Sequence, residues 1–233
     1  MPQPYAVILF DMDGTLFDLI ACERETVRRL LAESVPDLSP TTGEAFLAAY
    51  AQASPGHWAS GLAADASREA IVEAIFAAVC APPGMDILDQ TDLAERYWQL
   101  FAHVAVLEAD AQEILAALST RYRLGVISNG YADTQRPRLA AAGRTDFFET
   151  IVISGAVGWA KPDVRIFAHA LANLGVAPSA ALYVGDSLSH DLAGALAAGL
   201  DFCLYRPKGA DGLSLPPGVA VVTALSQLAT ILG

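Results

Sequence analysis

The stretch Val7-Ile8-Leu9-Phe10-Asp11-Met12-Asp13-Gly14-Thr15-Leu16 decides the fold, because an apolar run changes abruptly into two acids and a glycine. A short apolar run with β-branched residues, bounded by turn-forming residues, is typical of a strand buried on both faces. Similar runs recur further along the chain, at 123–128, 150–154, 181–185, 201–205 and 219–223. We expect each of these runs, and residues 5–10, to form a β-strand.

Helix-like segments separate the strands expected in the second half of the chain. Three of these segments stop at Gly143, Gly175 and Gly199, and glycine is common just after a helix ends. Strands that alternate with helices of about ten residues indicate βαβ units. The pattern therefore predicts an α/β fold with a doubly wound, parallel (Rossmann-like) sheet.

Residues 18–108 break this alternation. We find no strand pattern there, only alanine-rich helical stretches at 21–34, 44–53, 68–81 and 92–104, separated by turn-rich pieces such as Ser54-Pro55-Gly56. The sequence therefore predicts an inserted all-helical cap domain at 18–108 and an α/β core formed by 1–17 and 109–233. Five Arg and fourteen acidic residues give the insert a charge of −9, out of −12 for the whole chain.

Composition excludes several classes of protein. The 233 residues are 54% hydrophobic and 17% charged, enough to bury a sizeable core. No apolar run approaches the ~18 residues of a membrane span, and no basic leader precedes residues 5–10, so we expect a soluble, cytoplasmic protein. The negative charge disfavours nucleic acids and anionic membranes as partners. Three scattered cysteines indicate buried thiols rather than a zinc site. The sequence contains no feature that predicts the oligomeric state.

Polar residues stand just after the expected strands. Asp11 and Asp13 follow the first strand, Ser128-Asn129-Gly130 ends and follows the second, and Asp186 follows the fourth, with Asp191 five residues later. Lys161, one of only two lysines, precedes the fourth strand. Each piece alone is more often a turn or a helix cap. Ligands of doubly wound sheets bind beyond the carboxyl ends of the strands, so we expect these side chains to form one site.

Several carboxylates that converge at one edge repel one another unless a cation lies between them. An all-oxygen set favours Mg²⁺ as the cofactor. With the metal bound, the Ser128 hydroxyl, backbone N–H groups of the Asn129-Gly130 turn and the Lys161 ammonium could hold a phosphoryl group. Either Asp11 or Asp13 could then attack phosphorus, and the spacing alone leaves that choice open.

In these motifs the chain resembles the haloacid dehalogenase-like (HAD) superfamily of hydrolases. The resemblance rests on VILFDMDGTL (7–16), VISNG (126–130), Lys161-Pro162, and Gly185-Asp186-Ser187 through Asp191, in that order, and the helical insert is similar to the family's cap. Ser128-Asn129-Gly130 followed by Gln135, and the segment 157–162, look most like the pyrimidine 5'-nucleotidase branch.

The resemblance implies a two-step phosphoryl transfer. It makes Asp11 the nucleophile and Asp13 the general acid and base. It assigns Mg²⁺ to the Asp11 carboxylate, the Asp13 backbone carbonyl and Asp186, with Asp191 in support. Ser128, Asn129 and Lys161 would bind the phosphate.

The expected substrate is a small phosphate ester, with nucleoside 5'-monophosphates favoured over phosphoglycolate or sugar phosphates. The resemblance also bears on the alternatives. The family's phosphonate-cleaving members use a lysine of the cap, and the insert has none. The family's dehalogenases lack the second acid of the first motif, so the presence of Asp13 disfavours a dehalogenase. A catalytically silent binding protein is disfavoured because the four motifs are complete. Phe17 and Trp58 are the candidates for contact with the leaving group, although core packing is the commoner role of such aromatics.

Overall fold

The computed structural model describes residues 5–89 and 91–233, in two compact units. Unit 1 comprises residues 1–19 and 105–233, and unit 2 comprises residues 20–104. Residues 1–4, on which the expectation of a missing leader partly rests, lie outside the described residues.

Unit 1 is built on a six-stranded sheet with the order β3-β2-β1-β4-β5-β6, and every neighbouring pair is parallel. The strands are β1 (Val7–Phe10), β2 (Arg123–Ser128), β3 (Phe148–Ile153), β4 (Ala181–Gly185), β5 (Asp201–Tyr205) and β6 (Ala220–Val222). The chain adds β2 and β3 on one side of β1, then crosses to β4 on the other side. The prediction of a doubly wound parallel sheet is confirmed.

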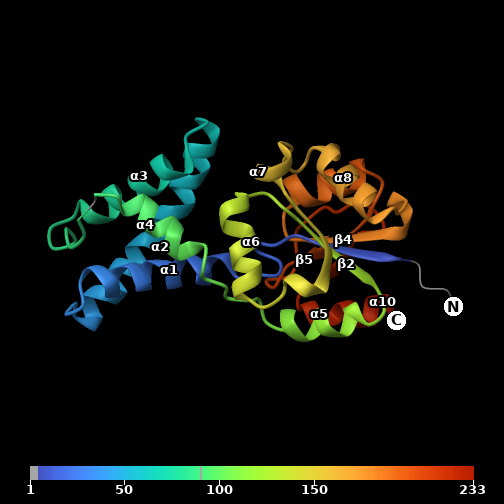
Figure 1. Cartoon of the computed structure of the whole chain (residues 1–233), viewed down its shortest axis with the longest axis horizontal. Helices are drawn as coiled ribbons and strands as arrows, with labels where there is room; N and C mark the ends of the chain where they lie inside the picture. The colour runs from blue at the N-terminus through green and yellow to red at the C-terminus, as the bar shows by residue number, and fades with distance from the viewer. Residues whose placement is uncertain (1–4, 90) are drawn as a thin grey trace. The chain divides into compact units, whose positions relative to one another are not determined.

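Helices cover both faces of this sheet (Figure 1). One face packs against α5 and α10, and the other against α8 and α9. The helices of unit 1 are α5 (Ala111–Ser119), α6 (Ala132–Ala141), α7 (Ser154–Val157), α8 (Val164–Leu174), α9 (Ala193–Ala197) and α10 (Leu228–Leu232). All four residues of β1 are fully buried, since a central parallel strand is covered on both sides.

The register of the central strands positions the site. Phe10, the last residue of β1, pairs with Val126 of β2 and with Val184 of β4. The segments that follow β1, β2 and β4 therefore leave the sheet at the same edge, next to the point where the chain reverses its direction of winding.

Unit 2 consists of helices among its described residues, 20–89 and 91–104. The helices are α1 (Leu19–Ser34), α2 (Pro40–Ala63), α3 (Arg68–Cys80) and α4 (Leu93–Phe101). The first residue of α1, Leu19, still belongs to the N-terminal segment of unit 1. Aromatic rings join α2, α3 and α4: Tyr50 of α2 packs against Phe76 of α3 at 5.4 Å and against Tyr97 of α4 at 6.1 Å between ring centroids.

The expected break at Ser54-Pro55-Gly56 is wrong, because α2 runs through Pro55. Proline lacks an N–H and normally kinks or ends a helix. Packing on both sides of Pro55 compensates: Tyr50 lies in the aromatic core, and Trp58 contacts Trp98 edge to face at 6.0 Å. Tertiary contacts in this helix outweigh the local preference.

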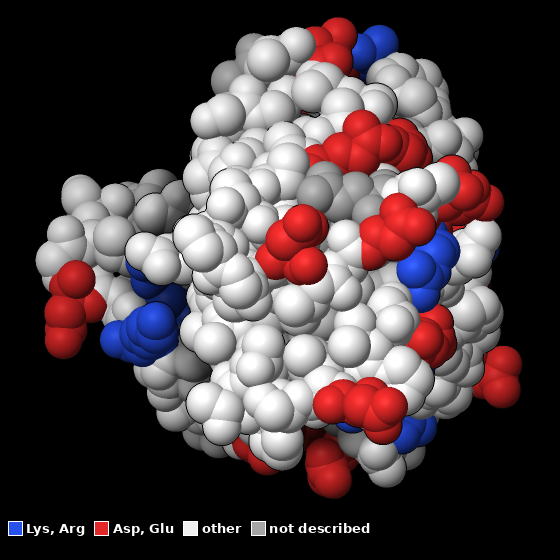
Figure 2. Space-filling model, turned by 90° about the vertical axis from the view of Figure 1, so that its left-hand side faces the viewer, with Lys and Arg blue, Asp and Glu red and all other residues white. Residues whose placement is uncertain are grey.

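Figure 2 shows one face of the molecule, over which acidic side chains are spread while basic ones occur at fewer places. Across residues 5–89 and 91–233, none of the helices combines the length and the apolar character that a bilayer crossing requires. All three cysteines, Cys22, Cys80 and Cys203, are buried and form no disulfide.

Candidate active site

Three carboxylates converge where β1 and β4 end. Asp11 follows β1, and its backbone N–H donates to the carbonyl of Val184 in β4 (2.8 Å). Asp186 follows β4, and Asp191 lies in a short π-helical turn (Leu188–Leu192). These three side chains can each place an oxygen within 4.8 Å of the other two. The predicted acids of the first and fourth motifs are therefore brought together, except for Asp13.

Gly14 allows the loop after β1 to approach Asp186. Its φ of +86° lies in the region that disfavours L side chains, and a Cβ there would lie 2.7 Å from Asp186 Oδ2. Gly185 plays a similar part on the other side, where a Cβ would lie 2.6 Å from Asp191 Cγ. Both glycines are needed because backbone and carboxylate approach more closely than a methyl group permits.

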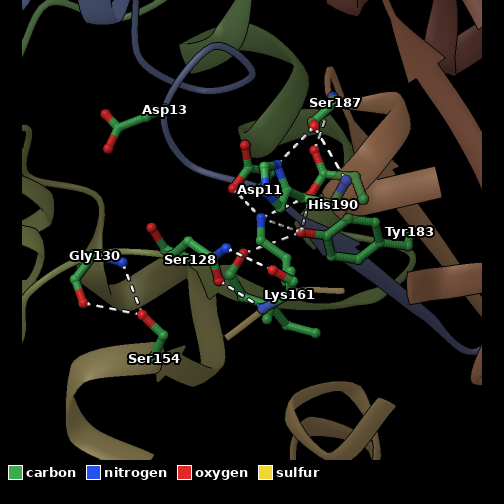
Figure 3. Close-up of polar contacts among 12 residues, drawn as sticks. Asp11, Asp13, Ser128, Gly130, Ser154, Lys161, Tyr183, Ser187 and His190 are labelled. Atoms are coloured by element: carbon green, nitrogen blue, oxygen red, sulfur yellow. Dashed lines mark hydrogen bonds and ion pairs between the residues drawn. The ribbon is translucent and has the colours of Figure 1, made fainter. Parts of the chain in front are cut away.

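Lys161 is the cation of the cluster. The residue is 4% exposed. Its ammonium lies 2.5 Å from Asp11 Oδ1, 2.7 Å from Asp191 Oδ1 and 2.9 Å from the Tyr183 hydroxyl (Figure 3). The Tyr183 hydroxyl lies 3.0 Å from the Ile127 carbonyl and 3.2 Å from Asp191 Oδ1, the two acceptors for its single proton. The backbone N–H of Ser187 donates a hydrogen bond to the other oxygen of this carboxylate, Asp191 Oδ2 (3.0 Å). Asp191 is thus engaged through both oxygens.

The charges of this cluster do not balance within the protein. Burial raises the pKa of Asp11, and Asp191 and Asp186 add to the rise while Lys161 opposes it. Burial and Asp191 likewise raise the pKa of Asp186. Burial alone would lower the pKa of Lys161, but the neighbouring Asp11 and Asp191 raise it. Three acids share one lysine, so the site has the electrostatics of a cation-binding site.

Asn129 holds Lys161 in place from the neighbouring loop. Its side-chain amide donates to the Lys161 carbonyl (2.9 Å) and accepts from the Lys161 N–H (2.8 Å). The Asn129 side-chain amide is therefore bound to the main chain of Lys161. The expected phosphate contact of Asn129 is through its backbone N–H, and that expectation stays a prediction.

Ser154, the first residue of α7 and the residue that follows β3, binds Gly130, the next residue of the same loop. The Gly130 N–H donates to Ser154 Oγ (3.0 Å), and Ser154 Oγ lies 3.2 Å from the Gly130 carbonyl (Figure 3). The expectation that the Gly130 N–H binds phosphate therefore does not fit this structure. Asn129, through its side chain, and Gly130, through its backbone, are thus both hydrogen-bonded to neighbouring segments.

Asp13 lies apart from Asp11 and Lys161 (Figure 3). Its carboxylate forms an ion pair with Arg138 (2.7 Å) and accepts a hydrogen bond from Gln135 Nε2 (2.7 Å). The same Gln135 nitrogen donates to Ser128 Oγ (2.9 Å). Ser128 is 1% exposed, and this network joins it to Asp13.

The two aromatic candidates pack against other side chains. Phe17 is fully buried, and the Arg138 guanidinium lies 5.0 Å from its ring centroid. This burial argues against the predicted contact of Phe17 with a substrate. Trp58 is half-buried in unit 2 and packs on Trp98, which the Arg68 guanidinium covers at 4.9 Å.

Sequence reasoning missed Arg138 and Tyr183 as members of the site. Tyr183 occurs inside an apolar strand and looks like core. Arg138 stands in a helix that also carries Arg136, so nothing in the composition of the helix distinguishes it. The one available signal was its spacing, since Arg138 follows Gln135 by three residues and so lies on the same side of α6.

Comparison with known proteins bears on this site. The family described as haloacid dehalogenase-like hydrolase matches residues 8–205. The pyrimidine 5'-nucleotidase PynA of Streptococcus pneumoniae is 29% identical over 87% of this chain and 84% of its own length. The pyrimidine 5'-nucleotidase YjjG of Escherichia coli is 34% identical over 58% of this chain and 60% of its own length.

A solved structure agrees with the fold. The crystal structure of the HAD-hydrolase YfnB of Bacillus subtilis, in a magnesium-bound form, superposes with a TM-score of 0.79 at 27% identity and covers 99% of this chain and 100% of its own. The predicted resemblance is confirmed at the level of the family.

Proposed function

This chain belongs to the haloacid dehalogenase-like hydrolases, and we propose that it is a magnesium-dependent phosphomonoester hydrolase with Asp11 as its nucleophile. One observation carries the proposal. The buried Asp11 carboxylate lies against Lys161 and beside two further acids, at the edge where Ser128 ends the neighbouring strand. Such a group of acids and one lysine suits a cation together with an anionic substrate, and the carboxylate can form a covalent intermediate.

The proposed reaction has two steps. An oxygen of Asp11 attacks phosphorus, the ester P–O bond breaks, and the leaving oxygen takes a proton from Asp13. Water then attacks the aspartyl-phosphate and gives a proton to Asp13, the bond between phosphorus and Asp11 breaks, and phosphate leaves. Ser128 donates its O–H to a phosphate oxygen, and the Lys161 charge balances the anion.

The residues present fit magnesium. The candidate ligands, Asp11, Asp186 and the Asp13 carbonyl, offer only oxygen, which is the donor that this ion prefers. Asp191 already binds Lys161 and the Ser187 N–H, so we give it a supporting role. When bound, magnesium supplies positive charge to the phosphoryl oxygens.

For the substrate we propose a nucleoside 5'-monophosphate. The support is that PynA and YjjG are named pyrimidine 5'-nucleotidases. Residues 18–108 would act as a cap over the leaving group, with Trp58 as a candidate contact. Small phosphometabolites such as phosphoglycolate or a sugar phosphate remain the alternative, because the identity with PynA is 29%. We still predict that nucleic acids and membranes are not partners, because the chain carries a net negative charge.

The test compares wild-type protein with Asp11→Asn and with Asp211→Asn, an exposed aspartate as the matched control. We expect Asp11→Asn to lose on the order of 10³-fold or more in the hydrolysis of p-nitrophenyl phosphate with Mg²⁺, because it lacks the nucleophile. Asp211→Asn should retain the wild-type rate. An unchanged rate in Asp11→Asn refutes the mechanism.

A panel of phosphate esters, each measured with Mg²⁺ and with EDTA, tests the substrate. Preference for uridine or thymidine 5'-monophosphate supports the nucleotidase proposal. Equal rates on nucleotides, sugar phosphates and phosphoglycolate reduce it to a general phosphatase. Absence of any magnesium-dependent turnover favours a silent binding protein.

A further inference from the structure

Arg138 is a fully buried arginine in unit 1, and the proposed reaction does not use it. It lies on α6, and its Nη1 contacts both Asp13 Oδ1 (2.7 Å) and Gln135 Oε1 (2.8 Å). The ring of Phe17 lies 5.0 Å from the guanidinium carbon and limits its position from another side. The Arg138 side chain is fully buried, and that of Asp13 is 20% exposed. An ion pair largely removed from water contributes little net stability, because desolvation of the charges costs about as much as their attraction gains. Stability alone is therefore a poor explanation of this arrangement.

Arg138 determines how the Gln135 amide is oriented. A guanidinium has only donors, so the amide must present its oxygen to Arg138. The amide nitrogen then faces the other way, and its two hydrogens reach Asp13 Oδ2 (2.7 Å) and Ser128 Oγ (2.9 Å). With the opposite orientation the amide nitrogen would face the guanidinium, and the amide oxygen would face a carboxylate. Both contacts would be repulsive.

The orientation of Gln135 in turn decides what Ser128 can do. Because the Ser128 oxygen accepts from Gln135, its own proton is left to point elsewhere, as a donor. A hydroxyl with that polarity suits a phosphate oxygen. One amide thus holds the proposed phosphate-binding hydroxyl and the proposed acid, Asp13, at a set separation.

We infer that Arg138 and Gln135 are positioning residues that fix Asp13 relative to Ser128, and so fix where the proton donor stands relative to the bound phosphoryl group. The inference rests on the proposed function. It assigns the two residues to the step in which the leaving group takes a proton, since that step requires Asp13 at one place. Neither residue touches the reacting atoms.

The test uses two esters that differ in their need for a proton. The leaving group of p-nitrophenyl phosphate departs readily as an anion, whereas an alkyl ester such as a nucleoside 5'-monophosphate or a sugar phosphate requires protonation. For Arg138→Met we expect kcat/KM to fall on the order of 10²-fold on the alkyl ester and less than ~10-fold on p-nitrophenyl phosphate. Arg136→Met, an exposed arginine of the same helix, is the matched control and should change neither rate.

Equal losses on both esters would overturn the inference, because a merely loosened fold affects both alike. Unchanged activity on the alkyl ester would also overturn it. Should Arg138→Met fail to fold by circular dichroism, Gln135→Glu replaces it. That isosteric variant keeps the partner of Arg138 but can no longer donate to Ser128 or Asp13, and the same selective loss is expected. If wild-type protein hydrolyses neither ester, the proposed function fails; if it hydrolyses both and the losses are uniform, only this inference fails.

Discussion

Replacing Lys161 with methionine tests the electrostatics of the carboxylate cluster. Methionine keeps most of the length and apolar volume of the side chain, so the change removes the ammonium rather than the packing. The ammonium contacts Asp11 at 2.5 Å and Asp191 at 2.7 Å, and the lysine side chain is 3% exposed. Its loss leaves two buried carboxylates without their counter-charge.

The expected cost follows from that burial. Removing one partner of a buried ion pair destabilises a protein by about 3–5 kcal/mol, because the other charge stays buried and unpaired. We expect Lys161→Met to lower the free energy of unfolding of unit 1 by this amount when EDTA is present. Urea denaturation, followed by circular dichroism, measures it. Added Mg²⁺ should recover part of the loss, since the ion supplies positive charge to the same carboxylates.

Lys208, the other lysine of the chain, is exposed and serves as the matched control. Lys208→Met should change the free energy of unfolding by no more than about 0.5 kcal/mol. A loss below about 1 kcal/mol in Lys161→Met would refute the reasoning, because it would mean that Asp11 and Asp191 do not depend on Lys161.

Two further predictions concern metal binding and the thiols. Mg²⁺ at about 100 times its dissociation constant should stabilise the wild-type protein by about 2.7 kcal/mol in the same assay. Asp186→Asn should abolish most of this gain. An equal gain in both proteins would mean that the ion binds elsewhere. Burial raises the pKa of the Cys203 thiol to about 12 and also raises that of Cys80, so both stay protonated at pH 8. Ellman's reagent should therefore label the native protein slowly at pH 8 and all three cysteines in denaturant, and rapid labelling of the native protein would contradict the burial.

The strands were predictable because their signal is local. A parallel strand covered on both faces must be largely apolar, and residues 7–10, 124–127, 181–185 and 202–205 meet that requirement. The polar residues after them were predictable as one site for a related reason. Parallel strands end at one edge, so their order along the chain is enough to bring Asp11, Lys161 and Asp186 into one neighbourhood.

The course of α2 was not predictable, because the decision at Pro55 depends on residues distant in sequence. The local signal at Ser54-Pro55-Gly56 is that of a turn. The packing of Tyr50 on Phe76 and Tyr97, and of Trp58 on Trp98, comes from α3 and α4. No window around Pro55 contains those partners.

Within the site, the order of motifs along the chain was sufficient to predict which carboxylates surround Asp11, but not where Asp13 points. Asp13 stands two residues from Asp11, yet its carboxylate binds Arg138 and Gln135 of α6, more than a hundred residues later. Likewise, the Asn129 side chain binds the main chain of Lys161, a contact that the motif alone does not indicate. The alternation of residues along a strand predicts the direction of the backbone and which side chains are buried. The choice among several hydrogen-bond partners depends instead on which side chains folding brings within about 3 Å of one another, and only the tertiary structure shows this.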